Sequence, residues 1–166
     1  MEALGRTIDL SIGFAVVDMS TAANTGKRVS VRHSQGLTVV LYKAVGTAAQ
    51  DPVLTFNQHT LSSGGTSQVV VAIDHYYKKS AATLAGTETW TRVTQTLGST
   101  VTLTGEAANQ GIYVFQVDGA RLADTFKYVS VDVADVGANA QLGGLLYILQ
   151  DLAVQRTPEN LRAALS

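Results

Sequence analysis

Short runs rich in Val, Thr, Ile, Tyr and Phe recur along almost the whole chain and are separated by Gly, Asn, Ser and Asp. Such runs are typical of β-strands and turns, and helical periodicity is nearly missing. About ten strands are predicted, at residues 12–19, 28–33, 37–45, 53–58, 68–78, 90–95, 100–104, 112–118, 126–133 and 141–149. Because the helices that would connect parallel strands are missing, we predict an all-β fold, an antiparallel β-sandwich with jelly-roll or immunoglobulin-like topology.

Two of these runs show almost no alternation between apolar and polar residues. Residues 69–73 read Val-Val-Val-Ala-Ile, and residues 144–149 read Gly-Leu-Leu-Tyr-Ile-Leu. A half-buried strand alternates, as the segment around Val29 and Val31 does, whereas a strand covered on both faces does not. Both runs are therefore predicted to be central strands, with the core on one side and a neighbouring element or subunit on the other.

The length of 166 residues fits one domain that buries its own core. We predict that residues 1–156 form a single β-sandwich domain with an extended N-terminal arm at about 1–11. Residues 80–89 are small and polar and are predicted to be a long exposed loop. Residues 157–166 are predicted to be a separate C-terminal docking segment.

The C-terminal segment has the residues expected at the start of a short helix. Thr157 suits the N-cap, and Pro158 suits the first helical position. Leu161, Ala164 and Leu165 would then share one face, but a helix of about nine residues is not stable in water by itself. We therefore expect this segment to dock on an apolar surface of a neighbouring molecule.

Charged residues make up 15% of the chain, and twelve Lys+Arg against thirteen Asp+Glu leave a formal net charge of −1. No basic excess is present to neutralise phosphates, so we predict neither nucleic acid nor an anionic membrane as a partner. A chain so weakly charged has little electrostatic protection against association, which favours a homo-oligomer or a larger assembly. We expect no signal peptide and no membrane-spanning segment, since the longest apolar stretch, 142–149, is far too short.

The residue types that carry catalysis or bind metals do not occur in a recognisable pattern. Cysteine is absent, and His33, His59 and His75 lack the spacing that brings metal ligands together. The aspartates between 118 and 135 do not match an EF-hand. No Gly-x-Ser-x-Gly motif occurs, and the Gly-rich stretch 62–67 has neither a Lys nor a following helix. We therefore predict no enzymatic activity, no cofactor and no bound metal.

Two segments carry a resemblance to a known family. Residues 51–58 read Asp-Pro-Val-Leu-Thr-Phe-Asn-Gln, and residues 126–143 begin Phe-Lys-Tyr-Val-Ser-Val-Asp-Val. With a looser match over roughly residues 20–150, the chain resembles small virion structural proteins of tailed bacteriophages that are found with head genes. The resemblance implies a capsid decoration or cement protein on the capsid exterior, made in the host cytoplasm, that bridges subunits of the major capsid protein.

The resemblance brings no catalytic or metal-binding residue with it. Candidate partner-binding residues are Leu161 and Leu165 in the C-terminal segment, and Tyr76 and Tyr77 in a polar-aromatic stretch. A tail or neck component is an alternative of the same kind. A carbohydrate-binding module that uses Tyr76, Tyr77 and Trp90 is an alternative from another class, although Trp90 on its alternating run is more typical of a core residue.

Overall fold

Eleven strands form two antiparallel sheets in the computed structural model, in which residues 3–166 are described. In chain order the strands are β1 (Ile8–Asp18), β2 (Val29–Ser30), β3 (Gly36–Lys43), β4 (Val53–His59), β5 (Ser67–Val69), β6 (Ile73–Ala81), β7 (Thr91–Gly98), β8 (Thr100–Thr102), β9 (Gln110–Asp118), β10 (Tyr128–Val133) and β11 (Leu142–Gln150). Two 3₁₀ turns, Gly119–Arg121 and Pro158–Asn160, are the helical elements of this part of the chain. None of its helices is long and apolar enough to cross a membrane.

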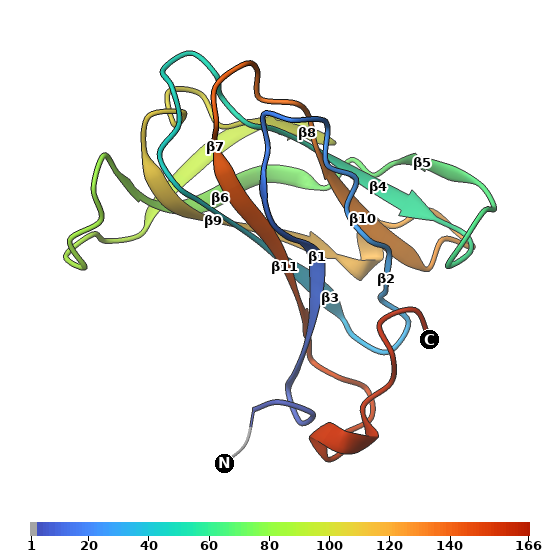
Figure 1. Cartoon of the computed structure of the whole chain (residues 1–166). Helices are drawn as coiled ribbons and strands as arrows, with labels where there is room; N and C mark the ends of the chain where they lie inside the picture. Colours follow the sequence, from blue (N-terminus) through green and yellow to red (C-terminus); the bar gives the residue numbers. More distant parts are fainter. Residues whose placement is uncertain (1–2) are drawn as a thin grey trace.

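The two sheets pack face to face as a sandwich. The larger sheet has the order β1-β11-β3-β9-β6-β7, and the smaller has the order β2-β10-β4-β5, with β8 also pairing with β4. Figure 1 shows that β1, β3 and β11 continue past the smaller sheet, toward the two ends of the chain. The predicted antiparallel β-sandwich is confirmed.

The core lies between the sheets and is built from every second side chain along the strands. Phe115 of β9 is fully buried at its centre, with its ring 5.5 Å from that of Phe56 on β4 and 5.4 Å from that of Tyr76 on β6. A buried hydrogen bond also joins the sheets, because the Val131 N–H of β10 donates to the Tyr147 hydroxyl of β11 at 3.0 Å. Aromatic packing and this bond hold the two layers together.

The predicted strand at 68–78 is two strands that belong to different sheets. β5 pairs with β4 in the smaller sheet, and β6 pairs with β7 and β9 in the larger. In the connection, Val69 and Val71 are 48% and 50% exposed, whereas Val70 is fully buried. The prediction that residues 69–73 form a central strand covered on both faces is therefore wrong. This apolar run connects the two sheets at the edge of the sandwich, where Val70 packs into the core and its neighbours Val69 and Val71 face solvent.

The other apolar run, residues 144–149, occupies the predicted central place. Its strand, β11, lies between β1 and β3, and both neighbours pair with it along most of its length. β1 begins at Ile8, so residues 8–11 of the arm predicted at about 1–11 belong to an edge strand of the larger sheet. Residues 1 and 2 of that arm lie outside the described residues.

The C-terminal segment 157–166 contains one 3₁₀ turn of three residues, so the predicted short helix is not confirmed. Pro158 stands at the start of the turn as predicted, but Thr157 makes no side-chain capping hydrogen bond. Residues 161–163 are irregular and residues 164–165 form a turn, where the Ser30 N–H of β2 donates to the Ala164 carbonyl at 2.7 Å. The chain therefore turns back onto the edge of the smaller sheet instead of continuing as a helix.

Removing residues 157–166 should lower the free energy of unfolding of the isolated protein by about 1–2 kcal/mol. The deletion leaves the Ser30 N–H without its partner, and it uncovers a hollow that Leu161 and Ala164 share with Leu149. Urea unfolding followed by circular dichroism measures the change, with deletion of Ser166 alone as the control. An unchanged midpoint would mean that the segment does not stabilise the monomer; its docking on a neighbouring molecule stays a prediction.

Candidate functional site

The larger sheet has one face on the core and one face turned away from it. Directly opposed residues of antiparallel strands point to the same side of a sheet, so the strand registers define rows across this second face. One row runs through Ile12, Leu146, Val40, Val114, Tyr77 and Arg92. The neighbouring rows and strand positions add Leu10, Ile148, Tyr42, Ile112 and Leu142. We call these eleven residues the outer face.

The outer face is apolar although it is not covered by the core. Ile12 is 53% exposed, Leu142 50% and Leu10 46%, and Leu146 and Ile148 remain partly exposed between them. Soluble monomers rarely expose contiguous apolar patches of this kind, and such patches mark interaction sites. Residues 144–149 therefore lack alternation because the strand carries apolar side chains on both faces, one against the core and the other open to solvent.

Aromatic and basic side chains gather at the β6–β7 end of the outer face. Tyr77, Trp90 and Val114 line a shallow apolar depression there. The Lys79 Nζ lies 5.0 Å from the centre of the Trp90 ring, a cation–π contact, and the His75 ring meets Tyr77 edge-on at 5.5 Å. Trp90 is 50% exposed, so the prediction that it lies in the core is wrong. It precedes the edge strand β7, where no second layer covers it.

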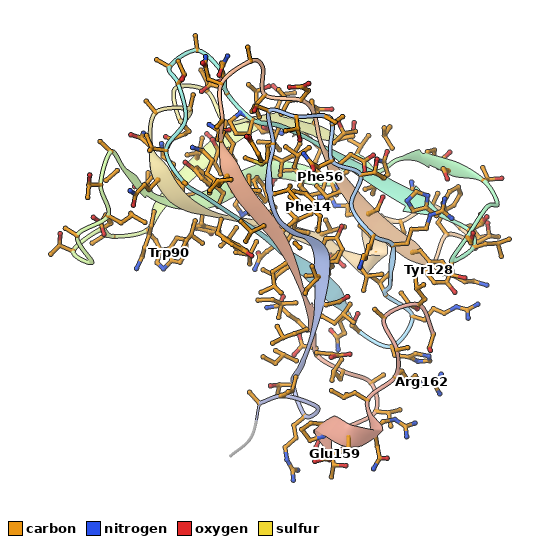
Figure 2. The ribbon with its side chains drawn as sticks, in the orientation of Figure 1. Phe14, Phe56, Trp90, Tyr128, Glu159 and Arg162 are labelled. Atoms are coloured by element: carbon orange, nitrogen blue, oxygen red, sulfur yellow. The ribbon has the colours of Figure 1, made fainter. Side chains whose placement is uncertain are left out.

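The structure does not bring the four predicted partner-binding residues together. Tyr76 and Tyr77 are neighbours on one strand and point to opposite sides of the sheet, Tyr76 into the core and Tyr77 onto the outer face. Leu161 is partly buried against its own chain, and Leu165 is 50% exposed. Figure 2 shows that the C-terminal segment and Trp90 lie at opposite sides of the molecule.

A buried ionic network lies on the core side of the same sheet. Glu106, in the turn after β8, is 3% exposed and accepts hydrogen bonds from the Tyr113 hydroxyl at 2.9 Å and from Asn109 Nδ2 at 3.2 Å. It also forms an ion pair with Lys78 of β6. Lys43 of β3 is 5% exposed and donates from Nζ to the Asn109 carbonyl at 2.5 Å. The network ties the turn before β9 to three strands, and no motif in the sequence indicates it.

The environment of this network fixes its protonation at neutral pH. Burial alone would raise the pKa of Glu106, but hydrogen bonds from four side chains, Lys78 first among them, lower it to about 2. Burial lowers the pKa of Lys43 to about 8, and the charge of Glu106 opposes that shift. Burial and the hydrogen bond to Glu106 raise the pKa of Tyr113. A carboxylate whose acceptors are already occupied is suited to holding strands together rather than to acid-base catalysis.

The three histidines lie on separate segments of the chain, and His75 contacts its neighbour Asp74, with Nδ1 2.5 Å from Oδ1. Among residues 3–166, no group of three or more His, Cys, Asp or Glu side chains is placed to hold a metal ion. His59 ends β4, His75 lies on β6, and His33 follows β2. Asp118 and Asp135 serve turns, each accepting a hydrogen bond from the backbone N–H two residues ahead, at 2.9 and 2.8 Å.

The stability of the protein should fall as the pH drops from 6.5 to 4, on account of His59. Its ring is 6% exposed between the hydroxyls of Ser67 and Ser130, at 2.7 and 2.9 Å. Burial, assisted by the charge of Arg28, lowers the pKa of His59 to about 4, so the unfolded chain takes up a proton that the folded chain does not. The loss is on the order of 2–3 kcal/mol at pH 4.

Urea unfolding at several pH values measures this slope. The His59→Gln variant should show a shallower slope between pH 6.5 and 4, and the His33→Gln variant should keep that of the parent protein. Equal slopes for the parent protein and the His59→Gln variant would contradict the assignment.

Comparison of the chain with known protein families, with characterised proteins and with solved structures finds no match in any of the three.

Proposed function

We propose that this chain is a structural protein of a tailed-phage particle, a head decoration or cement protein that binds the major capsid protein. The observation that carries the proposal is the outer face, a largely apolar surface to which all six strands of the larger sheet contribute. The proposed partner, the major capsid protein, is suggested by the resemblance of residues 51–58 and 126–143 to small virion structural proteins. A tail or neck position in the same particle would use the same surface.

The physical role of such a protein is to add buried area between neighbouring capsid subunits. Each copy removes apolar surface from water when its outer face meets the lattice, and many identical copies multiply a modest gain. Few charged side chains have to be desolvated, because Lys79 and Arg92 lie at one end of the surface. These added contacts would stabilise the capsid lattice against the outward pressure of packaged DNA. Contacts between copies, including those predicted for Leu161 and Leu165, would extend the same effect to a homo-oligomer.

The lattice proposal is tested with heads that lack this protein. Purified protein should add to such heads in a fixed stoichiometry, and decorated heads should release DNA at a higher temperature than bare heads. The Ile12→Lys/Ile112→Lys variant should weaken binding by roughly 100-fold, because it places two charges on the buried surface. Both side chains are exposed in the free protein, so the fold is retained.

The matched control is the Val69→Lys/Val71→Lys variant, whose side chains are similarly exposed outside the outer face. This variant should bind heads as the parent protein does. Equal binding by the outer-face variant, or equal DNA retention by bare and decorated heads, would contradict the proposal.

A carbohydrate-binding module is the second candidate function, and the depression formed by Tyr77, Trp90 and Val114 favours it. Exposed aromatic rings can stack on the apolar face of a sugar, and Trp90 is half exposed. Tyr76, which was predicted to share this role, faces the other side of the sheet. Loss of glycan-array binding in a Trp90→Ala variant would be the expected result for this candidate.

A further inference from the structure

A polar groove runs along one edge of the sandwich, away from the outer face. It forms where β7 leads through Ser99 into β8, so that one stretch of chain passes from the larger sheet to the smaller. The groove has a volume of about 480 Å³, within the usual range of ligand sites. Its lining consists of Tyr76, Lys78, Val93, Gln95 and five threonines, Thr94, Thr96, Thr100, Thr102 and Thr104.

The floor of the groove holds a hydroxyl group that lacks a partner. Tyr76 is 5% exposed and its ring packs on Phe115, yet its hydroxyl makes no hydrogen bond to another described residue. This hydroxyl is not among the buried, unpartnered polar atoms of the described residues, so it is open to the groove. A ligand hydroxyl in the groove would supply the missing hydrogen bond.

The groove offers hydrogen bonds without offering net charge. The charge of Lys78 is neutralised by Glu106, whose oxygens also accept from Asn109 and Tyr113. Gln95 uses its Nε2 to donate to the carbonyls of Ile73 and Thr100, which leaves its Oε1 for another donor. The threonine hydroxyls can each donate and accept. An anion finds no free cation here, and a cation finds no free carboxylate.

We propose that this groove binds a neutral polyhydroxylated ligand, an uncharged oligosaccharide. Sugar hydroxyls both donate and accept, which matches the threonine-lined wall, and the Val93 side chain and the Tyr76 ring provide apolar contact for the C–H groups of a sugar ring. The site is independent of the proposed lattice contact, because Tyr76 and Tyr77 point to opposite sides of β6. The protein would then bind a glycan while its outer face is covered.

The test is a titration of the full chain with maltohexaose, cellohexaose, laminarihexaose and chitohexaose, followed by amide chemical shifts. At least one of these should shift the amides of Thr94, Thr100 and Thr102 in a saturable manner. Tyr76→Phe removes only the hydroxyl and should weaken binding by about 3- to 10-fold. Tyr42→Phe, which makes the same change on the outer face, should leave the affinity unchanged.

Three results would overturn the inference. The first is the absence of binding by all four oligosaccharides at millimolar concentration. The second is binding that Trp90→Ala abolishes and Tyr76→Phe leaves intact, since that locates the glycan on the outer face. The third is saturable occupation of the groove by an extended peptide along the free edge of β7, with no oligosaccharide competing. Head binding by the Tyr76→Phe variant is measured in parallel, so failure of this site is distinguished from failure of the lattice proposal.

Discussion

Glu106→Ala should lower the free energy of unfolding by about 3–5 kcal/mol, because it removes the carboxylate that pairs with Lys78 in a buried charged network. Glu106 is 3% exposed and forms an ion pair with Lys78. Lys43 is also buried, and its Nζ donates a hydrogen bond to the Asn109 carbonyl. Without the carboxylate, the partly exposed ammonium of Lys78 and the buried hydroxyl of Tyr113 lose their partner. Urea unfolding at pH 7 measures the loss.

Two further variants separate charge from hydrogen bonding in this network. Glu106→Gln keeps an acceptor for Tyr113 and removes the charge, so it should destabilise the fold less than Glu106→Ala does. Glu88→Ala removes a carboxylate of an exposed loop and should leave the midpoint nearly unchanged, although it deletes hydrogen bonds to two backbone N–H groups. A Glu106→Ala protein as stable as its parent would show that the buried pair is replaceable.

Phe115→Ala should also cost about 3–5 kcal/mol, since it opens a cavity where the two sheets meet. The Phe115 ring is fully buried between those of Phe56 and Tyr76, which come from different sheets. Both neighbours would lose an aromatic contact, and backbone pairing on each side of β9 limits how far the strand can move to fill the space. Thermal and urea unfolding measure the loss.

The matched control for this variant is Gln116→Ala, the next residue on the same strand. Its side chain is exposed on the opposite face, so the change should be small. Similar losses for the two variants would mean that β9 is stabilised by its backbone pairing rather than by the core.

Most strands follow directly from the sequence because each dense run of β-branched and aromatic residues is bounded by turn residues. The predicted range 53–58 corresponds to β4, 112–118 to β9 and 141–149 to β11, each within two residues at either end. The run at 68–78 was predicted as one strand because composition alone does not distinguish a strand from an apolar connection between sheets. Which residues cross the edge is decided by pairing of β5 with the preceding strand β4 and of β6 with β9, which is distant in the chain.

The C-terminal helix was predicted from local signals that tertiary contacts override. Thr157 and Pro158 suit a helix start, yet so few residues gain little from helical hydrogen bonds. The Ser30 N–H at the edge of the smaller sheet donates to the Ala164 carbonyl, which lies in a turn at residues 164–165. No local pattern in residues 157–166 contains that information.

Only some features of the candidate sites can be predicted from the sequence. Alternation along a strand already places Tyr76 and Tyr77 on opposite sides, so their separation could have been predicted. The outer face could not, because its rows join strands whose order in the sheet differs from their order in the chain. The ionic network was missed for a similar reason, since Lys43 and Glu106 are far apart in the sequence and meet only through the fold.

The pairing of β1 with β11 determines when this fold can be completed. β1 is the first strand of the chain, and its ladder is formed with the last, with Ile8 opposite Gln150 and Asp18 opposite Leu142. During synthesis β1 leaves the ribosome before β11 and stays without this backbone partner until β11 has followed. Closing so long a loop is slow, so the larger sheet should be completed late in folding, and a nascent chain that stops before β11 exposes two strands prone to intermolecular pairing.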